Sequence, residues 1–242
     1  MGDMAYNMNQ MNIKEQPGAE LDDVSCAEPG AEPCIEPGAG MDACTGAEPM
    51  AWPETWTVNL SRELPEVRLP LVVSPTGFGI YAFNMMGQMK WNVECAAIFR
   101  EMLLESGVQF DIFLTAEAKA IGLTEELARL YSHEEYIVLR KSKKLYMSDP
   151  VELSVKSITT PEPQKFFLGR ESYNLLRGKR VVAVDDVIST GGTMHAFFEL
   201  TRQIGFTIVT IASVLTEETK WTEYESTPVI SIGHIPLPGQ IK

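Results

Sequence analysis

The sequence is poor in basic residues, and this scarcity argues against a general nucleic-acid-binding role. Its 242 residues include 20 Lys and Arg against 33 Asp and Glu, which gives a net charge of −13. Binding to a nucleic-acid backbone needs clustered Lys and Arg side chains, because these neutralise the phosphates. The deficit lies mainly at one end, since residues 1–60 hold eleven acidic residues and a single basic one, Lys14. We therefore expect no nucleic-acid partner.

Long apolar runs and targeting signals are also lacking. No stretch approaches the roughly 18 consecutive apolar residues that a membrane-spanning helix needs. The first residues show neither the basic start nor the apolar core of a signal peptide. We expect a cytoplasmic protein with no membrane partner. With 45% hydrophobic residues, a chain of this length can build one domain with a substantial core.

Cysteine and histidine are few and are not spaced for metal binding. Cys26, Cys34 and Cys44 are 8 and 10 residues apart with no histidine nearby, which matches no common zinc pattern, and we interpret them as free thiols. They belong to an acidic segment of irregular Glu-Pro-Gly-Ala units, a composition that buries too little apolar surface to offset its ordering entropy. Residues 1–53 are therefore predicted to be a disordered tail, and residues 54–242 to form the folded domain.

The remainder of the chain alternates strand and helix patterns. Helical periodicity predicts helices at 88–106 and at about 191–204, ended by Gly107 and Gly205, and Thr124 is expected to cap a third helix. Alternation of helices with nearly continuous apolar strands is typical of an α/β fold with a mostly parallel sheet flanked by helices. The strands are expected at residues 55–60, 68–75, 110–116, 135–140, 151–159, 165–169, 180–186 and 207–215.

Three polar segments directly follow predicted strands. They are TAEAKAIG after the strand at 110–114, RKSKK after the strand at 135–139, and DDVISTGGT at 185–193. The carboxyl ends of parallel strands meet at one edge of the sheet, and ligands bind at that edge. We therefore expect the three segments to form a single site.

The DDVISTGGT segment carries the strongest signal for a ligand. Adjacent carboxylates repel each other and resist desolvation, so Asp185 and Asp186 suggest a ligand that offers hydroxyl groups or a metal. The small residues that follow let backbone amides converge on an anion, and the next helix presents its positive end there. We favour this phosphate cradle over the alternative, a tight strand–helix connection whose Asp residues only cap and turn.

The segment VVAVDDVISTGGT resembles the signature of the type I phosphoribosyltransferases, which bind 5-phosphoribosyl 1-pyrophosphate (PRPP). The segments LTAEAKAIGL and YIVLRKSKKLYMSDPVELSVKSITT are similar to those of the adenine phosphoribosyltransferase-like branch, and the resemblance covers roughly residues 55–235. It implies a type I phosphoribosyltransferase fold, in which a mostly parallel central sheet flanked by helices carries a small hood subdomain. The early strands are expected to build this hood, with the 151–169 hairpin as a further candidate.

The resemblance also implies a role for each candidate residue. Asp185 and Asp186 would engage the ribose hydroxyls, Lys119 would assist the departure of pyrophosphate, and Mg²⁺ would bind mainly through PRPP near the two carboxylates. Arg62 would lie near the base. The 5-phosphate would contact Ser189, Thr190, Gly191, Gly192 and Thr193, and the pyrophosphate would contact Glu117, Ala118, Lys119, Arg140, Lys141 and Lys144.

The activity implied by the resemblance is transfer of phosphoribose from PRPP to a purine base, adenine first, with release of pyrophosphate by a homodimer in purine salvage. Two alternatives stay open. In the first, the acceptor base is xanthine, hypoxanthine, guanine or orotate. In the second, the protein is a regulator that senses PRPP without turnover. Ala120 supports the second alternative, because the family usually has glycine at this position. A dinucleotide fingerprint in TGFGIYA (76–82) lacks the acidic residue expected downstream and is disfavoured.

Overall fold

The computed structural model describes residues 52–147, 149–155 and 164–241. The predicted tail, with Cys26, Cys34 and Cys44, lies outside these residues except for Trp52 and Pro53. Trp52 packs edge-on against Tyr81, whose hydroxyl donates a hydrogen bond to the Pro53 carbonyl at 2.9 Å. The described elements are β1 (Thr55–Val58), β2 (Val67–Val73), β3 (Phe78–Tyr81), α1 (Met89–Ser106), β4 (Ile112–Ala116), α2 (Ile121–Leu130), β5 (Ile137–Leu139), β6 (Val151–Val155), β7 (Gln164–Leu168), α3 (Arg170–Leu176), β8 (Arg180–Ile188), α4 (Gly192–Ile204), β9 (Thr207–Glu217), β10 (Glu223–Tyr224), β11 (Thr227–Ile235) and β12 (Gly239–Gln240).

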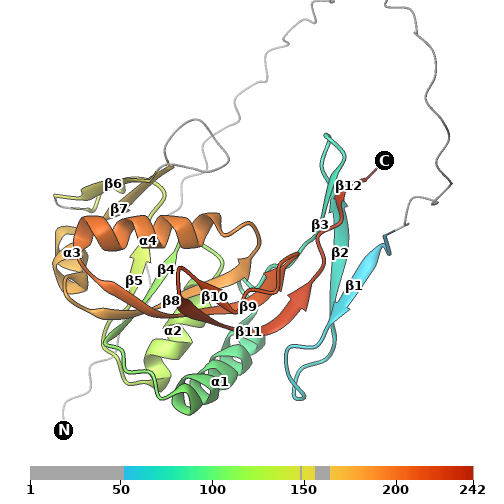
Figure 1. Cartoon of the computed structure of the whole chain (residues 1–242), viewed down its shortest axis with the longest axis horizontal. Helices are drawn as coiled ribbons and strands as arrows, with labels where there is room; N and C mark the ends of the chain where they lie inside the picture. Colours follow the sequence, from blue (N-terminus) through green and yellow to red (C-terminus); the bar gives the residue numbers. More distant parts are fainter. Residues whose placement is uncertain (1–51, 148, 156–163, 242) are drawn as a thin grey trace, which may run out of the picture. The chain divides into compact units, whose positions relative to one another are not determined.

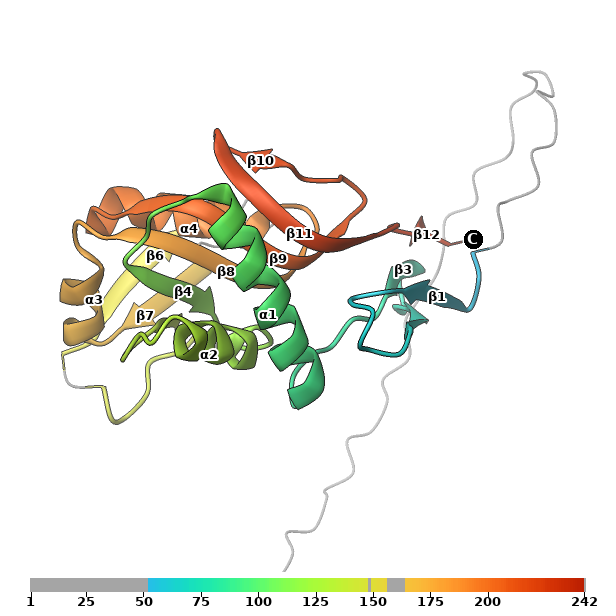
Figure 2. The same cartoon turned by 90° about the horizontal axis from the view of Figure 1, so that it is seen from below.

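The central sheet has the strand order β10-β11-β9-β8-β4-β5, and all its neighbours are parallel except the short edge strand β10. Helices α1 and α2 cover one face of this sheet, and α4 covers the other (Figures 1 and 2). Strand alternation divides the core accordingly: Val182 and Val184 join the α1–α2 cluster, whereas Val181 and Ala183 join the α4 cluster. The predicted α/β fold with a mostly parallel sheet is confirmed.

Local signals place the helix ends well, with one exception. Gly107 and Gly205 take left-handed φ values of 66° and 83° and end α1 and α4 as predicted. The cap assigned to Thr124 is wrong, because α2 already begins at Ile121. Thr124 is fully buried inside the helix, and its hydroxyl donates backwards to the Ala120 carbonyl at 2.7 Å. None of the described helices is long and apolar enough to cross a membrane.

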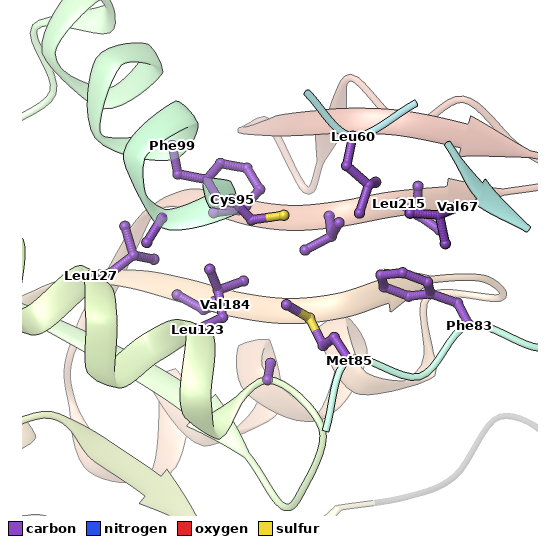
Figure 3. Packing of buried hydrophobic residues seen from close by; sticks show 14 of the residues in the cluster. Leu60, Val67, Phe83, Met85, Cys95, Phe99, Leu123, Leu127, Val184 and Leu215 are labelled. Atoms are coloured by element: carbon purple, nitrogen blue, oxygen red, sulfur yellow. The ribbon is translucent and has the colours of Figure 1, made fainter. Parts of the chain in front are cut away.

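A small antiparallel sheet of order β1-β2-β3-β12 forms the hood. Its inner residues Val58, Leu60 and Val67 share a core cluster with Leu215 of the central sheet (Figure 3). The 76–82 segment, considered above as a dinucleotide fingerprint, instead makes a turn at Gly77 (φ 81°) and then strand β3. It lacks the strand–turn–helix context that a dinucleotide site requires.

The β6–β7 hairpin does not belong to the hood, which corrects one of the expectations above. The two strands pair with each other as predicted, and a bridge between Arg140 and Phe167 joins them to the end of β5. The apolar side chains of the hairpin, among them Leu153 and Phe166, are buried in the cluster that contains α4. The hairpin is therefore a separate two-stranded sheet at the β5 end of the central sheet, and its apolar side chains are buried in the cluster that contains α4.

Candidate functional site

The three polar segments converge on one cavity of about 200 Å³ at the carboxyl ends of β4, β5 and β8. This confirms the expectation that they lie together. Phe166 of the hairpin closes the cavity from a fourth element and is almost completely buried. The cavity is lined by Ala116, Glu117, Ala118, Lys119, Lys141, Phe166, Asp185, Asp186, Val187 and Thr193.

Strand β8 continues through the acid pair, two residues beyond its predicted end. Both carboxylates line the cavity and lie close to each other. Asp185 accepts a hydrogen bond from the Thr193 side chain at the start of α4. Asp186 faces Lys119, whose Nζ lies 3.1 Å from Asp186 Oδ2. No donor is well aimed at this buried oxygen, although the ammonium is close to it. The acid pair therefore retains capacity to accept hydrogen bonds from a ligand.

Lys119 connects the acid pair to the hood. Besides its contact with Asp186, its Nζ donates a hydrogen bond to the Phe83 carbonyl at 3.2 Å. Phe83 belongs to the segment between β3 and α1, and its ring stacks on Trp91. The Lys119 side chain remains half exposed, so its ammonium can also reach a ligand in the cavity.

Asp185 is destabilised as an anion. Burial, followed by the neighbouring Asp186 charge, raises the pKa of Asp185 from 3.8 to about 7. The folded protein therefore holds a proton on Asp185 between about pH 4 and pH 7 that the unfolded chain releases. Because the folded state binds more protons in this window, the free energy of unfolding falls as the pH rises through it.

We expect the Asp185→Asn variant to be more stable than the wild type at pH 8. The amide removes a charge penalty of roughly 2–4 kcal/mol, since one pKa unit corresponds to about 1.4 kcal/mol, and it can still accept the Asp186 amide hydrogen bond, which is 2.9 Å in the wild type. Thermal melting at pH 4 and pH 8 measures this, and the difference between variant and wild type should be small at pH 4. An Asp185→Asn protein that melts below the wild type at pH 8 would contradict it.

The segment predicted to hold a phosphate, residues 189–193, packs against two aromatic side chains that follow β9. Gly191 has a left-handed φ of 79° directly before α4, and a side chain there would meet the rings of Tyr224 and Trp221. Trp221 Nε1 donates to the Ser189 carbonyl at 3.1 Å. Trp221 lies 32 residues after Ser189, in a connection with no motif, so this contact could not be predicted from the sequence.

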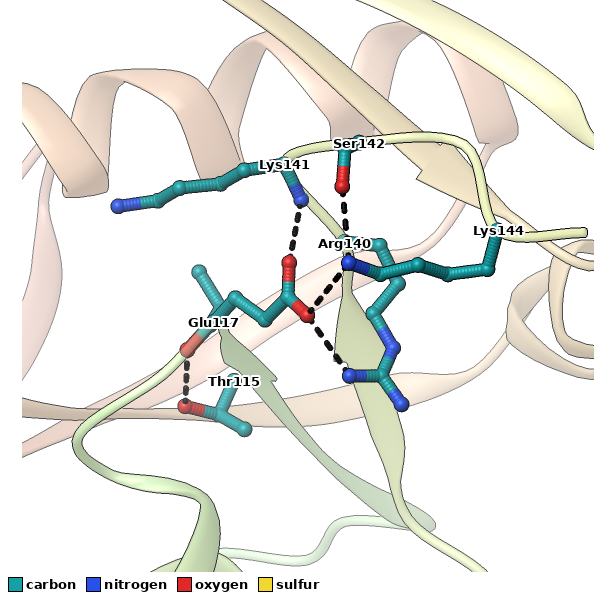
Figure 4. A network of polar contacts seen from close by, with 7 residues as sticks. Thr115, Glu117, Arg140, Lys141, Ser142 and Lys144 are labelled. Carbon is teal, nitrogen blue, oxygen red and sulfur yellow. Dashed lines mark hydrogen bonds and ion pairs between the residues drawn. The ribbon is translucent and has the colours of Figure 1, made fainter. Parts of the chain in front are cut away.

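Glu117 organises the basic segment that follows β5 (Figure 4). Its carboxylate accepts hydrogen bonds of 2.8 Å from Arg140 Nη1 and from the Lys141 amide, and Lys144 Nζ lies 3.8 Å away. Burial alone would raise the pKa of Glu117, but these three partners outweigh it and lower the pKa. Arg140 and Lys144 therefore contact Glu117 and do not line the cavity themselves. Of the basic segment, only Lys141 lines the cavity.

Several residues singled out from the sequence do not line the cavity, among them Ser189, Thr190, Gly191 and Gly192 of the predicted phosphate segment. Arg62 is exposed in the connection between β1 and β2 and is not among the cavity-lining residues. Ala120 is buried, and its methyl group packs in the core cluster rather than in the cavity. The Ala120 methyl group therefore does not line the cavity beside Lys119. The peptide bond between Glu117 and Ala118 is cis.

The geometry agrees with a comparison of the sequence with protein families. The phosphoribosyl transferase domain matches residues 89–235, which run from α1 to the end of β11 and include every segment that lines the cavity. The chain belongs to the phosphoribosyl transferase domain family. The hood strands β1, β2, β3 and β12 lie outside the matched part of the phosphoribosyl transferase domain.

Individual relatives of this phosphoribosyl transferase domain carry different names. The chain is 33% identical to a hypoxanthine/guanine phosphoribosyltransferase of Methanothermococcus okinawensis over 110 residues, which are 46% of this chain and 56% of that protein. It is 30% identical to an adenine phosphoribosyltransferase of Kosmotoga olearia over 122 residues, 50% of this chain and 66% of that protein. The chain thus spans only about half to two thirds of the length of these curated relatives.

Solved structures agree on the fold. An adenine phosphoribosyltransferase from Thermoanaerobacter pseudethanolicus superposes with a TM-score of 0.54 and 20% identity, over 69% of this chain and 95% of that one. An adenine phosphoribosyltransferase from Trypanosoma brucei, solved with AMP, pyrophosphate and ribose-5-phosphate, gives a TM-score of 0.51 at 19% identity, over 67% and 74% of the two chains. The chain therefore has the type I phosphoribosyltransferase fold that the sequence predicts.

Proposed function

We propose that this protein transfers phosphoribose from PRPP to a purine base and releases pyrophosphate. The observation that carries the proposal is the single cavity in which an acid pair, a lysine and a helix start meet at the carboxyl ends of three strands. Carboxylates of this kind accept hydrogen bonds from sugar hydroxyls, and the start of a thirteen-residue helix favours a phosphate. Membership of the phosphoribosyl transferase domain family supports the same function.

In this proposal each polar segment has one task. Asp185 and Asp186 accept hydrogen bonds from the ribose 2′- and 3′-hydroxyls, and residues 189–193 hold the 5-phosphate. The bond from ribose C1 to the pyrophosphate oxygen breaks, the electron pair leaves on that oxygen, and a bond forms from C1 to a ring nitrogen of the base, which loses its proton. Lys119 and Lys141 lie where they can stabilise the negative charge that grows on the pyrophosphate.

The acid pair also fits the Mg²⁺ that accompanies pyrophosphate. Magnesium prefers oxygen ligands and usually binds through one or two carboxylates together with substrate phosphates. Asp186 Oδ2 is a buried oxygen without a well-directed donor, and no group of three or more His, Cys, Asp or Glu in the described residues could hold a metal alone. Asp185 and Asp186 would therefore hold the ion jointly with PRPP, and the ion would neutralise charge on the leaving pyrophosphate.

The test is an assay of pyrophosphate release by the full-length protein with PRPP and Mg²⁺. Adenine, guanine, hypoxanthine, xanthine and orotate are supplied one at a time, and we expect release that depends on a purine. No release with any base, together with calorimetric binding of PRPP, would replace this proposal with a PRPP-sensing regulator. Absence of PRPP binding would remove the site assignment as well.

A further inference from the structure

Trp221 lies in the connection between β9 and β11, and its indole ring lies against the phosphate segment, residues 189–193. Its Nε1 donates a hydrogen bond to the Ser189 carbonyl at 3.1 Å. A side chain at Gly191 would lie 3.6 Å from both Cζ2 and Cη2 of the same indole. A single ring outside the motifs of the carboxyl edge is therefore in place to fix the conformation of this segment.

The hydrogen bond from Trp221 determines which way the first peptide group of the phosphate segment faces. The peptide bond between Ser189 and Thr190 is trans. In a planar trans peptide group the carbonyl and the N–H point in opposite directions. Because the Ser189 carbonyl faces the indole, the Thr190 amide faces away from it, towards the opposite side of the segment.

The amides of the phosphate segment are available to a ligand. Among the described residues, no hydrogen bond is donated by the amide of Thr190, Gly191 or Gly192. Backbone amides beside a left-handed residue and at the start of a helix form a concavity that favours an anion. Gly191 is that left-handed residue, with a φ of 79°, and α4 begins directly after it. The contact with Trp221 thus orients a donor that has no acceptor in the described part of the chain.

Trp221 is itself held in place by contacts to α4. Its ring packs against Tyr224 with the centroids 5.7 Å apart, and Tyr224 packs against Phe198 of α4 at 5.2 Å. Arg202, also on α4, forms an ion pair with Glu225 at 3.3 Å. The connection is therefore anchored on the same helix whose start belongs to the phosphate segment, so the indole and the segment form one packed unit.

We propose that Trp221 is a positioning residue that orients the phosphate segment for the 5-phosphate of PRPP. The inference rests on the proposed function and adds a residue that does not line the cavity. Without the indole N–H, the Ser189 carbonyl loses its partner, and the peptide group that carries the Thr190 amide is free to turn. The effect should be confined to the phosphate end of PRPP, because Lys119 and Lys141, which face the pyrophosphate in the proposed function, lie in other segments.

The experiment measures the binding of two fragments of PRPP to the full-length protein by isothermal titration calorimetry with Mg²⁺. Ribose 5-phosphate probes the phosphate segment, and inorganic pyrophosphate probes the end at Lys119. Trp221→Phe retains an aromatic ring but removes the N–H. We expect this variant to bind ribose 5-phosphate about three- to tenfold more weakly, the loss typical of one neutral hydrogen bond, and to bind pyrophosphate as the wild type does. In turnover, KM for PRPP should rise while kcat stays unchanged.

Two further variants separate the N–H donor from the ring that carries it. Trp221→His at pH 8 retains a ring with an N–H and should recover part of the affinity for ribose 5-phosphate. The matched control is Tyr224→Phe, which changes the neighbouring ring of the same connection and should leave both affinities unchanged. Unchanged ribose 5-phosphate affinity in Trp221→Phe would overturn this inference alone. Equal weakening for both fragments, with a lowered melting temperature, would reduce Trp221 to a structural role.

The fragment measurements do not depend on turnover, so they distinguish this inference from the proposed function. A wild type that binds ribose 5-phosphate and loses it selectively in Trp221→Phe, but never releases pyrophosphate, would overturn only the proposed function. A wild type that binds neither ribose 5-phosphate nor PRPP would overturn the site assignment and this inference together.

Discussion

Replacing both acids of the pair, in the Asp185→Asn, Asp186→Asn protein, should weaken PRPP binding by at least about 100-fold. Hydrogen bonds to a charged acceptor contribute about 1.5–3 kcal/mol each. In the proposed function the double variant loses this charge at two ribose hydroxyls and at the position proposed for Mg²⁺. Isothermal titration calorimetry with PRPP and Mg²⁺ measures the loss. The variant should remain folded, because the Asp185 carboxylate is destabilising above pH 7 in the absence of a ligand.

A control for this experiment exists at the opposite end of the same strand. Asp111 accepts hydrogen bonds from Arg180 at the start of β8, including one of 2.8 Å from Arg180 Nη2. Those contacts hold the pKa of Asp111 down at about 2. Asp111→Asn removes one carboxylate beside the first residue of β8 but leaves the acid pair near the other end of this strand unchanged. The affinity for PRPP should therefore stay the same. Equal PRPP affinity in the wild type and in the acid-pair variant would mean that the ribose lies elsewhere.

Lys119→Met should lower kcat for pyrophosphate release by about 100-fold, the loss typical of removing one preorganised donor to developing negative charge. The affinity for PRPP should fall by less than about tenfold, because the Lys119 contribution grows as the pyrophosphate leaves. Single-turnover kinetics with saturating PRPP and base separates the two quantities. Lys119→Arg retains the charge and should recover part of the rate.

Lys179→Met serves as the control for Lys119, since Lys179 directly precedes β8 and lies at the edge of the sheet remote from the cavity. The Lys179→Met variant should release pyrophosphate with the kcat of the wild type. If Lys119→Met did so as well, the role of Lys119 would be limited to holding the Phe83 carbonyl and Asp186 together. A fall in melting temperature without a fall in kcat would support that structural role.

Much of the central fold could be predicted from sequence because its signals are local. Apolar runs marked β4, β5, β8 and β9 of the parallel sheet but not β11, and the glycines at 107 and 205 marked two helix ends through their left-handed backbone. The candidate site followed from these predictions, since polar segments after parallel strands must share one edge. The Thr124 cap failed because the helix begins one turn earlier, in a segment without a recognisable capping residue.

The features that could not be predicted depend on contacts distant in sequence. The pairing of β12 with β3 joins residues separated by most of the folded chain, and the short β12 has no periodicity of its own. The support of Ser189 by Trp221 and the bond between Lys119 and Phe83 are likewise set by packing. The β6–β7 hairpin was correctly identified as a hairpin, but which surface it covers depends on the apolar face of α4.

The hood limits where this chain can be shortened, because its sheet is formed by two stretches that lie far apart in the sequence. Gly239 and Gln240 of β12 hydrogen-bond beside Gly79 and Phe78 of β3, and the Ile241 amide donates to the Gly77 carbonyl at 2.8 Å. A truncation that removes residues 239–241 therefore removes the edge strand of the hood sheet and its hydrogen bonds to β3.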